Sequence, residues 1–382
     1  MQNDPKESLL DSDAPLKAKR RTFVTMAGAL SAALASPTLF DSPSVLAADS
    51  RKVGFSFATY TAPRFAKLDL PVFRQAAAAA GYSTISLQAD SKVDRQSDDV
   101  QNLLGQQIAA LTLMAVTGES GVSLVRQCKQ AGVPVIAYNN EIPSAEVSAY
   151  VARDNFAVGV LMAKGAETFL GGTLKGNFVI ASGHPGDGVA LGITQGYMQV
   201  LKPAIERRDV KVISQEFHEG WDPELARRQV ENALTRTNNN IQAILCNSDG
   251  MAGGAIAALR AQGLAGKVYV CGLDATNEAC RLILMGELTF DVFTKCDEMA
   301  RQAAELSVQL AQGKTISGKR RYPVRGGGSV PYFPTESYAI NRDNMVAYLK
   351  KYSPSYVDAR VVLQGIPEDK LPPGAEDLLK TS

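Results

Sequence analysis

The stretch IQAILCNSDGMAGGAIAALRAQGLAGKVYVCGLDATN, residues 241–277, contains a complete strand–helix–strand unit. The apolar runs Ile241–Asn247 and Val268–Leu273 are short and rich in β-branched residues, as buried strands are. Met251–Gln262 lies between them with helical spacing, and Gly263 follows where a helix commonly ends. The stretch therefore predicts two parallel strands joined by a helix that packs on their sheet.

The same alternation extends from about residue 52 to residue 352. The other predicted strands are Val53–Phe57, Ser83–Gln88, Ala109–Ala115, Val133–Tyr138, Gly176–Ala181 and Val210–Glu216. The other predicted helices are Leu70–Ala80, Asp98–Gln107, Val122–Gln130, Asn155–Leu170, Val189–Lys202, Pro223–Thr235 and Asp297–Gln312. Alternation of this kind predicts an α/β fold in which helices cover both faces of parallel sheets.

The predicted units form two runs of roughly four, which indicates two lobes. The helix at 297–312 is surplus to the second run, so we expect the chain to return to the first lobe there. A last strand, Glu336–Ile340, and a helix, Asn344–Lys351, follow. We assign residues 51–154 and 293–330 to an N-terminal lobe, residues 155–292 and 331–352 to a C-terminal lobe, and residues 353–382 to a surface tail.

Residues 1–47 have the pattern of an export signal. Basic residues between positions 17 and 21 precede the uncharged stretch Thr22–Phe40, and Val45–Ala47 suit a signal peptidase. We expect cleavage after Ala47 or Ala48 and a soluble protein in the periplasm. The motif Arg20-Arg21-Thr22-Phe23 resembles a twin-arginine signal, with an ordinary Sec signal as the alternative.

Composition excludes several classes of function. The chain has 40 Lys and Arg and 39 Asp and Glu residues, so it has no excess charge to attract nucleic acid or an anionic membrane. It has no Walker loop, HExxH motif or Gly-x-Ser-x-Gly elbow, and we expect no metal and no cofactor. We expect unpaired buried thiols, with a disulfide as the alternative, at Cys128, Cys246, Cys271, Cys280 and Cys296.

Polar residues follow the predicted strands of both runs, at the end where open α/β sheets bind ligands. They include Thr59, Tyr60, Thr61 and Arg64; Asn139, Asn140 and Glu141; Arg153, Asp154 and Asn155; His184 and Asp187; Trp221 and Asp222; Asn247, Ser248 and Asp249; and Asp274 and Asn277. Asn, Asp and Arg side chains can bond adjacent sugar hydroxyls. Trp221 could cover the apolar face of a sugar ring, or could equally be a core residue. The pattern predicts a polyhydroxylated ligand.

Other roles are open for some of these residues. Asp187, Asp249 and Asp274 each precede a predicted helix, where Asp is a favoured N-cap. Ser182, His184 and Asp187 share one loop, as acid–base or nucleophilic groups could, but neighbours in sequence seldom point at one another. Asp249 and Asp274 could in principle serve a glycosidase. We expect a binding protein and not an enzyme.

Several segments match the motifs of one known family. They are Val53–Ser56, Met198–Pro203, Glu219–Glu224, Glu231–Thr235 with Asn238–Asn240, and Ala252–Ile256 with Ala261–Val268. Through them the chain resembles the periplasmic binding proteins of the ribose- and galactose-binding type, and most closely the D-xylose-binding proteins of ABC importers. The resemblance covers residues 52–344.

The resemblance implies a type I periplasmic binding protein fold, in which two Rossmann-like lobes are joined by three hinge strands and close over one monosaccharide. The closed form docks on a permease in the inner membrane. The resemblance also implies ligand contacts at Arg64, Asn139, Asn140, Asp187, Trp221, Asp249, Asp274 and Lys295.

The chain departs from the xylose binders at several of these positions. Asn139-Asn140 stand where those proteins tend to have Asp-Arg, and Gly188 and Val189 stand where they have Asn-rich residues. Thr194, Ser248 and Thr294 replace Arg, Asn and Lys, although Lys295 is adjacent to the last of these. The departures replace charged or longer side chains in the pocket by shorter, neutral ones, so the identity of the sugar stays open.

The sequence as a whole predicts the substrate-binding component of an ABC sugar importer. The expected ligand is a D-xylose-like pentose or a related sugar or polyol, and the expected form is a monomer. The alternatives are a sugar-sensing subunit for a chemoreceptor or histidine kinase and, less favoured, a carbohydrate-active enzyme. A transcription regulator is excluded, because the N-terminus reads as an export signal and not as a helix-turn-helix.

Replacement of Arg20 and Arg21 by Lys tests the twin-arginine interpretation. We expect the double variant to accumulate as precursor in the cytoplasm, because the export receptor reads the arginine pair. Immunoblots of periplasmic and cytoplasmic fractions measure the outcome. A normal periplasmic yield would instead identify a Sec signal.

Overall fold

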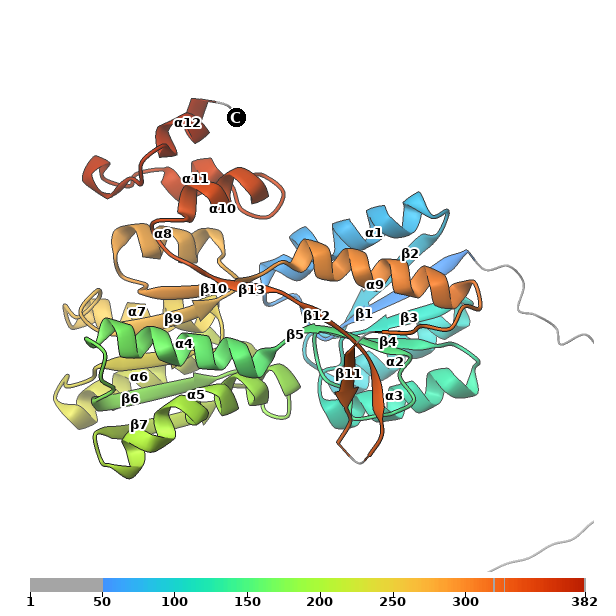
Figure 1. Ribbon diagram of the computed structural model, residues 1–382, viewed down its shortest axis with the longest axis horizontal. Coiled ribbons are helices and arrows are strands. Elements are labelled where there is room, and N and C mark those ends of the chain that lie inside the picture. The colour runs from blue at the N-terminus through green and yellow to red at the C-terminus, as the bar shows by residue number, and fades with distance from the viewer. Residues whose placement is uncertain (1–50, 319, 326, 381–382) are drawn as a thin grey trace, which may run out of the picture. The chain divides into compact units, whose positions relative to one another are not determined.

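The computed structural model describes residues 51–318, 320–325 and 327–380 (Figure 1). Their strands form two sheets, one of seven strands and one of six, and helices lie on both faces of each sheet. The predicted α/β fold with two lobes is confirmed. The predicted signal peptide, its arginine motif and its cleavage site lie outside the described residues. None of the helices in the described part of the chain is long and apolar enough to cross a membrane.

The first sheet has the strand order β11-β12-β5-β4-β3-β1-β2, and every pair is parallel except β11 with β12. Its strands are β1 (Lys52–Phe57), β2 (Ser83–Gln88), β3 (Ala110–Leu113), β4 (Val135–Tyr138), β5 (Ala149–Arg153), β11 (Arg320–Pro323) and β12 (Ser329–Thr335). One face packs against η1 (Phe65–Asp69), α1 (Leu70–Ala79) and α9 (Cys296–Ala311), and the other against α2 (Val93–Gly105) and α3 (Gly118–Gln130).

The second sheet has the order β13-β10-β9-β8-β6-β7, with only β13 antiparallel to its neighbour. Its strands are β6 (Gly176–Ser182), β7 (Val210–Phe217), β8 (Ala243–Cys246), β9 (Tyr269–Leu273), β10 (Phe290–Thr294) and β13 (Ser337–Ile340). Helices α4 (Asn155–Phe169) and α5 (Gly188–Glu206) cover one face. The other face carries α6 (Pro223–Thr237), α7 (Asp249–Ala261) and α8 (Asn277–Met285), with η2 (Glu219–Trp221) after β7.

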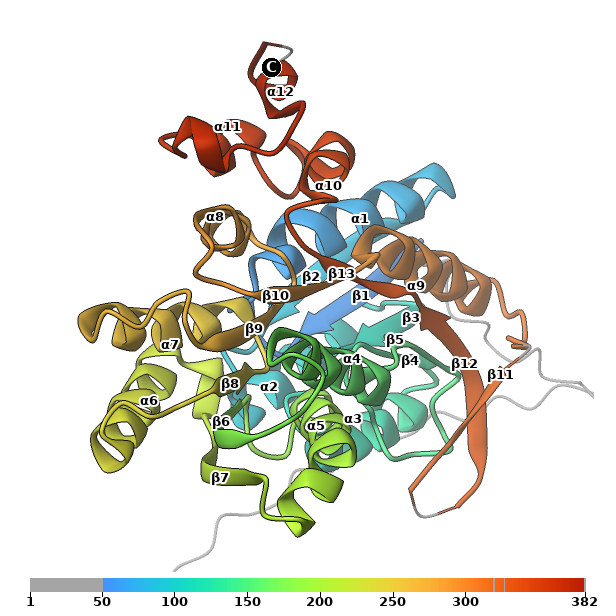
Figure 2. The same ribbon diagram turned by 60° about the vertical axis from the view of Figure 1, so that its left-hand side comes forward.

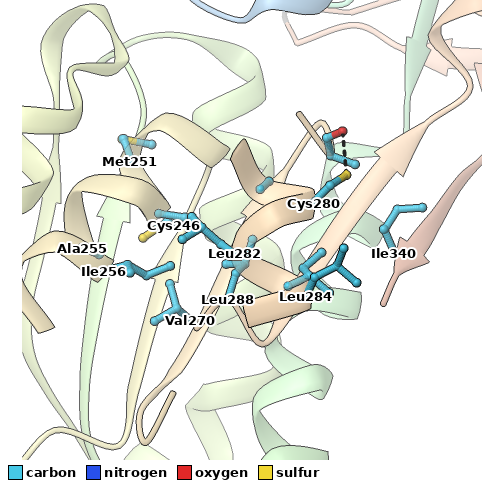
Figure 3. Packing of buried hydrophobic residues seen from close by; sticks show 14 of the residues in the cluster. Cys246, Met251, Ala255, Ile256, Val270, Cys280, Leu282, Leu284, Leu288 and Ile340 are labelled. Atoms are coloured by element: carbon cyan, nitrogen blue, oxygen red, sulfur yellow. Dashed lines mark hydrogen bonds between the residues drawn. The ribbon is translucent and has the colours of Figure 1, made fainter. Parts of the chain in front are cut away.

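The two-residue period of the buried strands explains why both faces are covered. In β6, Phe178 and Ile180 belong to the core under α4 and α5, whereas Val179 and Ala181 belong to the core under α6 and α7. Figure 3 shows the second of these cores, where Cys246 and Ile256 pack among aliphatic side chains. A strand that is apolar on both faces has no side that tolerates water, so it requires helices above and below.

All five cysteines are free and buried, which confirms the expected unpaired thiols. The predicted strands and helices are present, but some bounds differ. Helices α2 and α3 begin several residues before the predicted starts, because their first turns, residues 93–96 and 118–121, carry no apolar period. The hairpin β11–β12 was not predicted, since Pro323, Pro331 and Pro334 argue against strands. Pro323 lies on the edge strand β11, whereas Pro331 and Pro334 lie where β12 pairs with only one neighbouring strand.

The chain crosses between the lobes at Asp154, Lys295 and Glu336. Strand β10 stays in the second sheet up to Thr294, and β12 stays in the first up to Thr335, so the predicted boundaries at 293 and 331 are corrected by a few residues. The apolar pattern of a strand does not change where the chain leaves one lobe for the other. The sequence therefore located these crossings only approximately.

The predicted surface tail is also corrected. After α10 (Met345–Tyr352), the chain forms α11 (Ala359–Leu363), η3 (Glu368–Lys370) and α12 (Ala375–Lys380). Helix α11 lies beside α8, and α12 lies beyond it, as Figures 1 and 2 show. Tyr356, Val357 and Val362 are buried and join the core of the second lobe. The prolines of this segment indicated irregular backbone, but they carried no information about what the apolar residues between them would cover.

Helices α4 and α5 pack unusually closely through glycine. A Cβ atom at Gly159 would lie 2.0 Å from the carbonyl oxygen of Ile193 and 3.0 Å from the Cα of Gly196. Only a residue without a side chain fits between these two backbones.

Gly159→Ala should therefore lower the free energy of unfolding by about 1–3 kcal/mol, since the helices must move apart. Gly105→Ala is the matched control. Gly105 ends α2 with no atom within 4 Å of an added Cβ, and alanine there should be neutral or stabilise by about 0.5–1 kcal/mol. Urea denaturation measures both changes, and equal stability of the two variants would contradict the proposed close packing.

Candidate functional site

A cavity of 460 Å³ lies between the carboxyl ends of the two sets of strands. Its lining includes seven of the eight predicted contacts, namely Arg64, Asn139, Asn140, Asp187, Trp221, Asp249 and Asp274. The first three belong to the first lobe and the other four to the second. The arrangement follows from the parallel sheets, because their strands all deliver the residues that follow them to the same edge.

Lys295 is not among the residues that line the cavity. Its Nζ lies 2.6 Å from Oε2 of Glu336 and 3.8 Å from Oε1 of Glu298. Its backbone N–H also donates to the carbonyl oxygen of Glu336 at 3.0 Å. The structure therefore places Lys295 outside the cavity, where its contacts join two of the chain crossings.

Arg64 follows β1 and is only 1% exposed. Its Nη2 donates to Oδ1 of Asn139 at 2.6 Å and lies 3.7 Å from Oδ2 of Asp69. Its Nε lies 3.7 Å from Oδ1 of Asp274, which belongs to the other lobe. Burial lowers the pKa of Arg64, but Asp69, Cys296 and Asp274 more than offset this effect, so the pKa is raised and the guanidinium stays charged.

Asp69 lies behind Arg64 and accepts a hydrogen bond of 2.7 Å from the hydroxyl of Tyr138. Burial raises the pKa of Asp69 to about 6, against the opposing effects of Arg64 and Tyr138. Sequence reasoning missed Asp69, because it directly precedes the predicted helix Leu70–Ala80 and does not directly follow a strand.

Arg153 ends β5 and was counted among the strand-end polar residues, but not among the candidate contacts. Its Nη1 donates to Oδ1 of Asn139 at 3.4 Å and lies 4.0 Å from Oδ1 of Asp274. Burial and the neighbouring Arg64 lower its pKa. Asn139 thus receives two guanidinium groups on one oxygen, while its Nδ2 donates to Oδ1 of Asn140 at 2.7 Å.

Asp187 and Trp221 form the opposite wall of the cavity. Asp187 is the N-cap of α5, since its Oδ1 accepts from the N–H of Val189 at 2.8 Å. Burial raises the pKa of Asp187 to about 7, although hydrogen bonds from Val189 and the Trp221 side chain oppose the shift. The indole of Trp221 covers Gly183, where an added Cβ would lie 2.5 Å from ring atoms. Asp187 is therefore both a cap and a cavity residue.

The alternative interpretation of Asp249 and Asp274 as helix N-caps is wrong. Ser248 caps α7, and Thr276 caps α8. Oδ2 of Asp249 instead accepts from the backbone N–H of Thr276 at 2.7 Å. Oδ1 of Asp274 is buried without a hydrogen-bond partner. Neither carboxylate is needed to satisfy the start of its following helix.

Asp249 also pairs with Asp291 of β10, over Gly272. A Cβ at Gly272 would lie 2.5 Å from Oδ1 of Asp249 and 3.3 Å from Oδ2 of Asp291, so glycine makes room for both carboxyl groups. Burial raises the pKa of Asp249 to about 7, and burial with the charge of Asp249 raises that of Asp291 well above its usual range. Both carboxyl groups therefore bind a proton more readily than an exposed aspartate does.

Several buried polar atoms at the cavity have no hydrogen-bond partner within the described part of the protein. They comprise two donors, Nε of Arg64 and Nε of Arg153, and acceptors that include Oδ1 of Asn247 and Oδ1 of Asp274. Unpaired buried groups are costly, and groups of both kinds suit a ligand whose hydroxyls donate and accept.

The suggested Ser182–His184–Asp187 constellation does not assemble. The hydroxyl of Ser182 bonds that of Thr194 at 2.7 Å, Nδ1 of His184 accepts from the N–H of Gly220 at 3.0 Å, and Asp187 caps α5. Each group is committed to a different neighbour. The geometry gives none of them the contacts of a nucleophile–base pair.

The family model described as a periplasmic binding protein domain matches residues 53–315. The chain belongs to this family. The resemblance to type I sugar-binding periplasmic proteins is thereby confirmed. The D-xylose-binding periplasmic protein of Escherichia coli (strain K12) is 33% identical to this binding protein over 263 residues, which cover 69% of this chain and 78% of that one. That of Haemophilus influenzae is 31% identical over 294 residues, 77% and 87% of the two chains.

Solved structures of solute-binding proteins share the fold of this binding protein. An ABC transporter solute binding protein from Clostridium phytofermentans with bound β-D-glucose matches with a TM-score of 0.71 at 24% identity, over 84% of this chain and 99% of that one. One from Bacillus halodurans with bound myo-inositol matches with a TM-score of 0.68 at 24% identity, over 79% and 98%.

The carboxyl pair makes the stability of the binding protein dependent on pH. Because the pKa of Asp249 is about 7 in the folded chain against 3.8 as the ordinary value, the folded state holds its proton more tightly. The free energy of unfolding should therefore fall as pH rises through this window. Asp291→Asn should reduce that fall by about 1.4 kcal/mol or more, the equivalent of one pKa unit, because it removes a second carboxyl group whose pKa is raised well above its usual range in the folded chain.

Urea denaturation at acidic and at mildly alkaline pH measures the difference. Asp343→Asn, which removes an exposed carboxylate from the same lobe, is the control and should leave the pH dependence unchanged. An Asp291→Asn variant with the pH dependence of the parent would show that Asp291 does not bind its proton more tightly in the folded state.

Proposed function

We propose that the protein is the periplasmic substrate-binding component of an ABC sugar importer, and that it holds one monosaccharide or related polyol between its lobes. The observation that carries the proposal is the set of unpaired buried donors and acceptors, contributed by both lobes, around a single cavity. Membership of the periplasmic binding protein family supports the role, as does the likeness to proteins named for D-xylose binding.

The charges at the cavity favour a neutral ligand. Arg64 and Arg153 face Asp274, and Asp69 stands behind Arg64, so positive charge is compensated by protein carboxylates. A volume of 460 Å³ lies toward the lower end of small-molecule sites and suits a single sugar ring. Trp221 provides an aromatic face against which the C–H groups of such a ring can pack.

Contacts between the lobes support a closing mechanism. A Cβ at Gly188 would lie 3.1 Å from Cβ of Glu141, and one at Gly186 would lie 3.5 Å from Cγ2 of Thr117. Glu141 and Thr117 belong to the first lobe and the two glycines to the second. The lobes thus meet beside the cavity, and a ligand bound by both favours this closed arrangement by its differential affinity.

A thermal-shift panel of pentoses, hexoses and cyclitols tests the proposal, since a ligand that binds only the folded state raises the melting temperature. At least one member, such as D-xylose, D-glucose or myo-inositol, should raise it. Asp274→Asn should then weaken binding of that sugar about tenfold or more in calorimetric titration, because it loses a charge-assisted hydrogen bond in a closed cleft.

Asp154→Asn is the matched control. Asp154 is an exposed cap of α4 outside the cavity, and Asn also caps well, so affinity should not change. A panel in which no sugar or polyol raises the melting temperature would count against the proposed function. If Asp274→Asn binds the sugar as tightly as the parent, Asp274 is not a ligand-binding residue.

A further inference from the structure

The loop between β9 and α8 carries Asp274 in an unfavourable backbone conformation. Asp274 has φ of 103° and Ala275 has φ of 50°, and both lie on the positive side that residues other than glycine rarely adopt. Two such residues in succession persist only where surrounding contacts hold them. The contacts of this loop therefore determine where the Asp274 carboxylate points.

The C-terminal part of the chain supplies those contacts. The hydroxyl of Tyr356 donates to the carbonyl oxygen of Asp274 at 2.9 Å, and that of Tyr348 donates to the carbonyl oxygen of Ala275 at 2.7 Å. The backbone N–H of Asp358 donates to Oδ1 of Asn277 at 2.9 Å. Three hydrogen bonds from the C-terminal part of the chain thus hold residues 274, 275 and 277 of the loop.

Tyr356 is itself fixed in place. It is 4% exposed, and its ring lies 6.0 Å from that of Phe293 between centroids. The segment 353–380, which follows α10, is anchored on α8, where Nη1 of Arg281 donates to the carbonyl oxygens of Val361 and Val362 at 3.0 Å and 3.2 Å. Figure 2 shows α11 beside α8. The segment lies beyond residues 53–315, which the family model matches.

Tyr356 also lines the cavity. The C-terminal segment therefore reaches the candidate site from outside the two sheets, and it does so at the residue that supports Asp274. We propose that residues 353–380 form a positioning element of the ligand site, in which Tyr356 holds Asp274 in its strained conformation and so keeps the carboxylate ready to accept from a ligand hydroxyl. This inference rests on the proposed function.

Tyr356→Phe tests the inference, because it removes only the hydroxyl and keeps the ring. Tyr352→Phe is the matched control, since Tyr352 also packs on Phe293 but its hydroxyl donates to Oδ1 of Asp297 at 3.3 Å, away from the loop. Calorimetric titrations with D-xylose, D-glucose and myo-inositol measure binding. Loss of one neutral hydrogen bond should weaken binding about three- to tenfold in Tyr356→Phe, whereas Tyr352→Phe should match the parent within about twofold.

A double-variant cycle separates positioning from direct contact. If Tyr356 acts through Asp274, Tyr356→Phe should change affinity by less than about twofold in an Asp274→Asn background. An equal loss in both backgrounds would show that Tyr356 acts on the sugar independently and would overturn the inference. Parent-like affinity of the single variant would overturn it as well.

Hydrogen exchange on the ligand-free proteins gives a readout that needs no sugar. Amide exchange over residues 274–277 should be faster in Tyr356→Phe than in the parent and in Tyr352→Phe, because the loop opens more readily. Unchanged exchange would overturn the inference. If the parent binds none of the three sugars, the proposed function is weakened, while this comparison still decides whether Tyr356 holds the loop.

Discussion

Arg64 places a positive charge where almost no water reaches it, and a charge in such a place requires compensation by the protein. Asp69 and Asn139 of the first lobe provide part of it, and Asp274 of the second lobe provides the rest. Because the partners come from both lobes, the charge is fully compensated only when the lobes meet. The charge balance of the cavity therefore depends on the same contacts between the lobes that the proposed closing mechanism requires.

The path of the chain between the lobes is compatible with this closing mechanism. Three crossings join the lobes, and Lys295 and Glu336, which lie on two of them, are held together by a backbone hydrogen bond and an ion pair. In the proposed closing mechanism, these few connections with a shared anchor act as the hinge. Each sheet can then stay rigid while the distance between Arg64 and Asp274 changes.

Asn139 meets both arginines of the cavity with an amide that carries no charge. A single neutral oxygen accepts from both Arg64 and Arg153. Arg153 consequently depends on Asp274 for charge compensation, whereas Arg64 also has Asp69 nearby. The position of the Asp274 loop, to which Tyr356 donates a hydrogen bond, therefore affects the charge balance of the cavity.

The sequence by itself determined the α/β fold, the two lobes, the buried thiols and seven residues of the cavity. Each of these follows from local patterns: apolar runs of strand length, helical spacing between them, and polar residues directly after the strands. Tertiary structure alone decided that Arg153 faces Asp274, that Asp69 lies behind Arg64, that Lys295 pairs with Glu336, and that Tyr356 reaches the cavity. These are contacts between segments far apart in the chain, and no local pattern encodes which distant carboxylate a buried charge will meet.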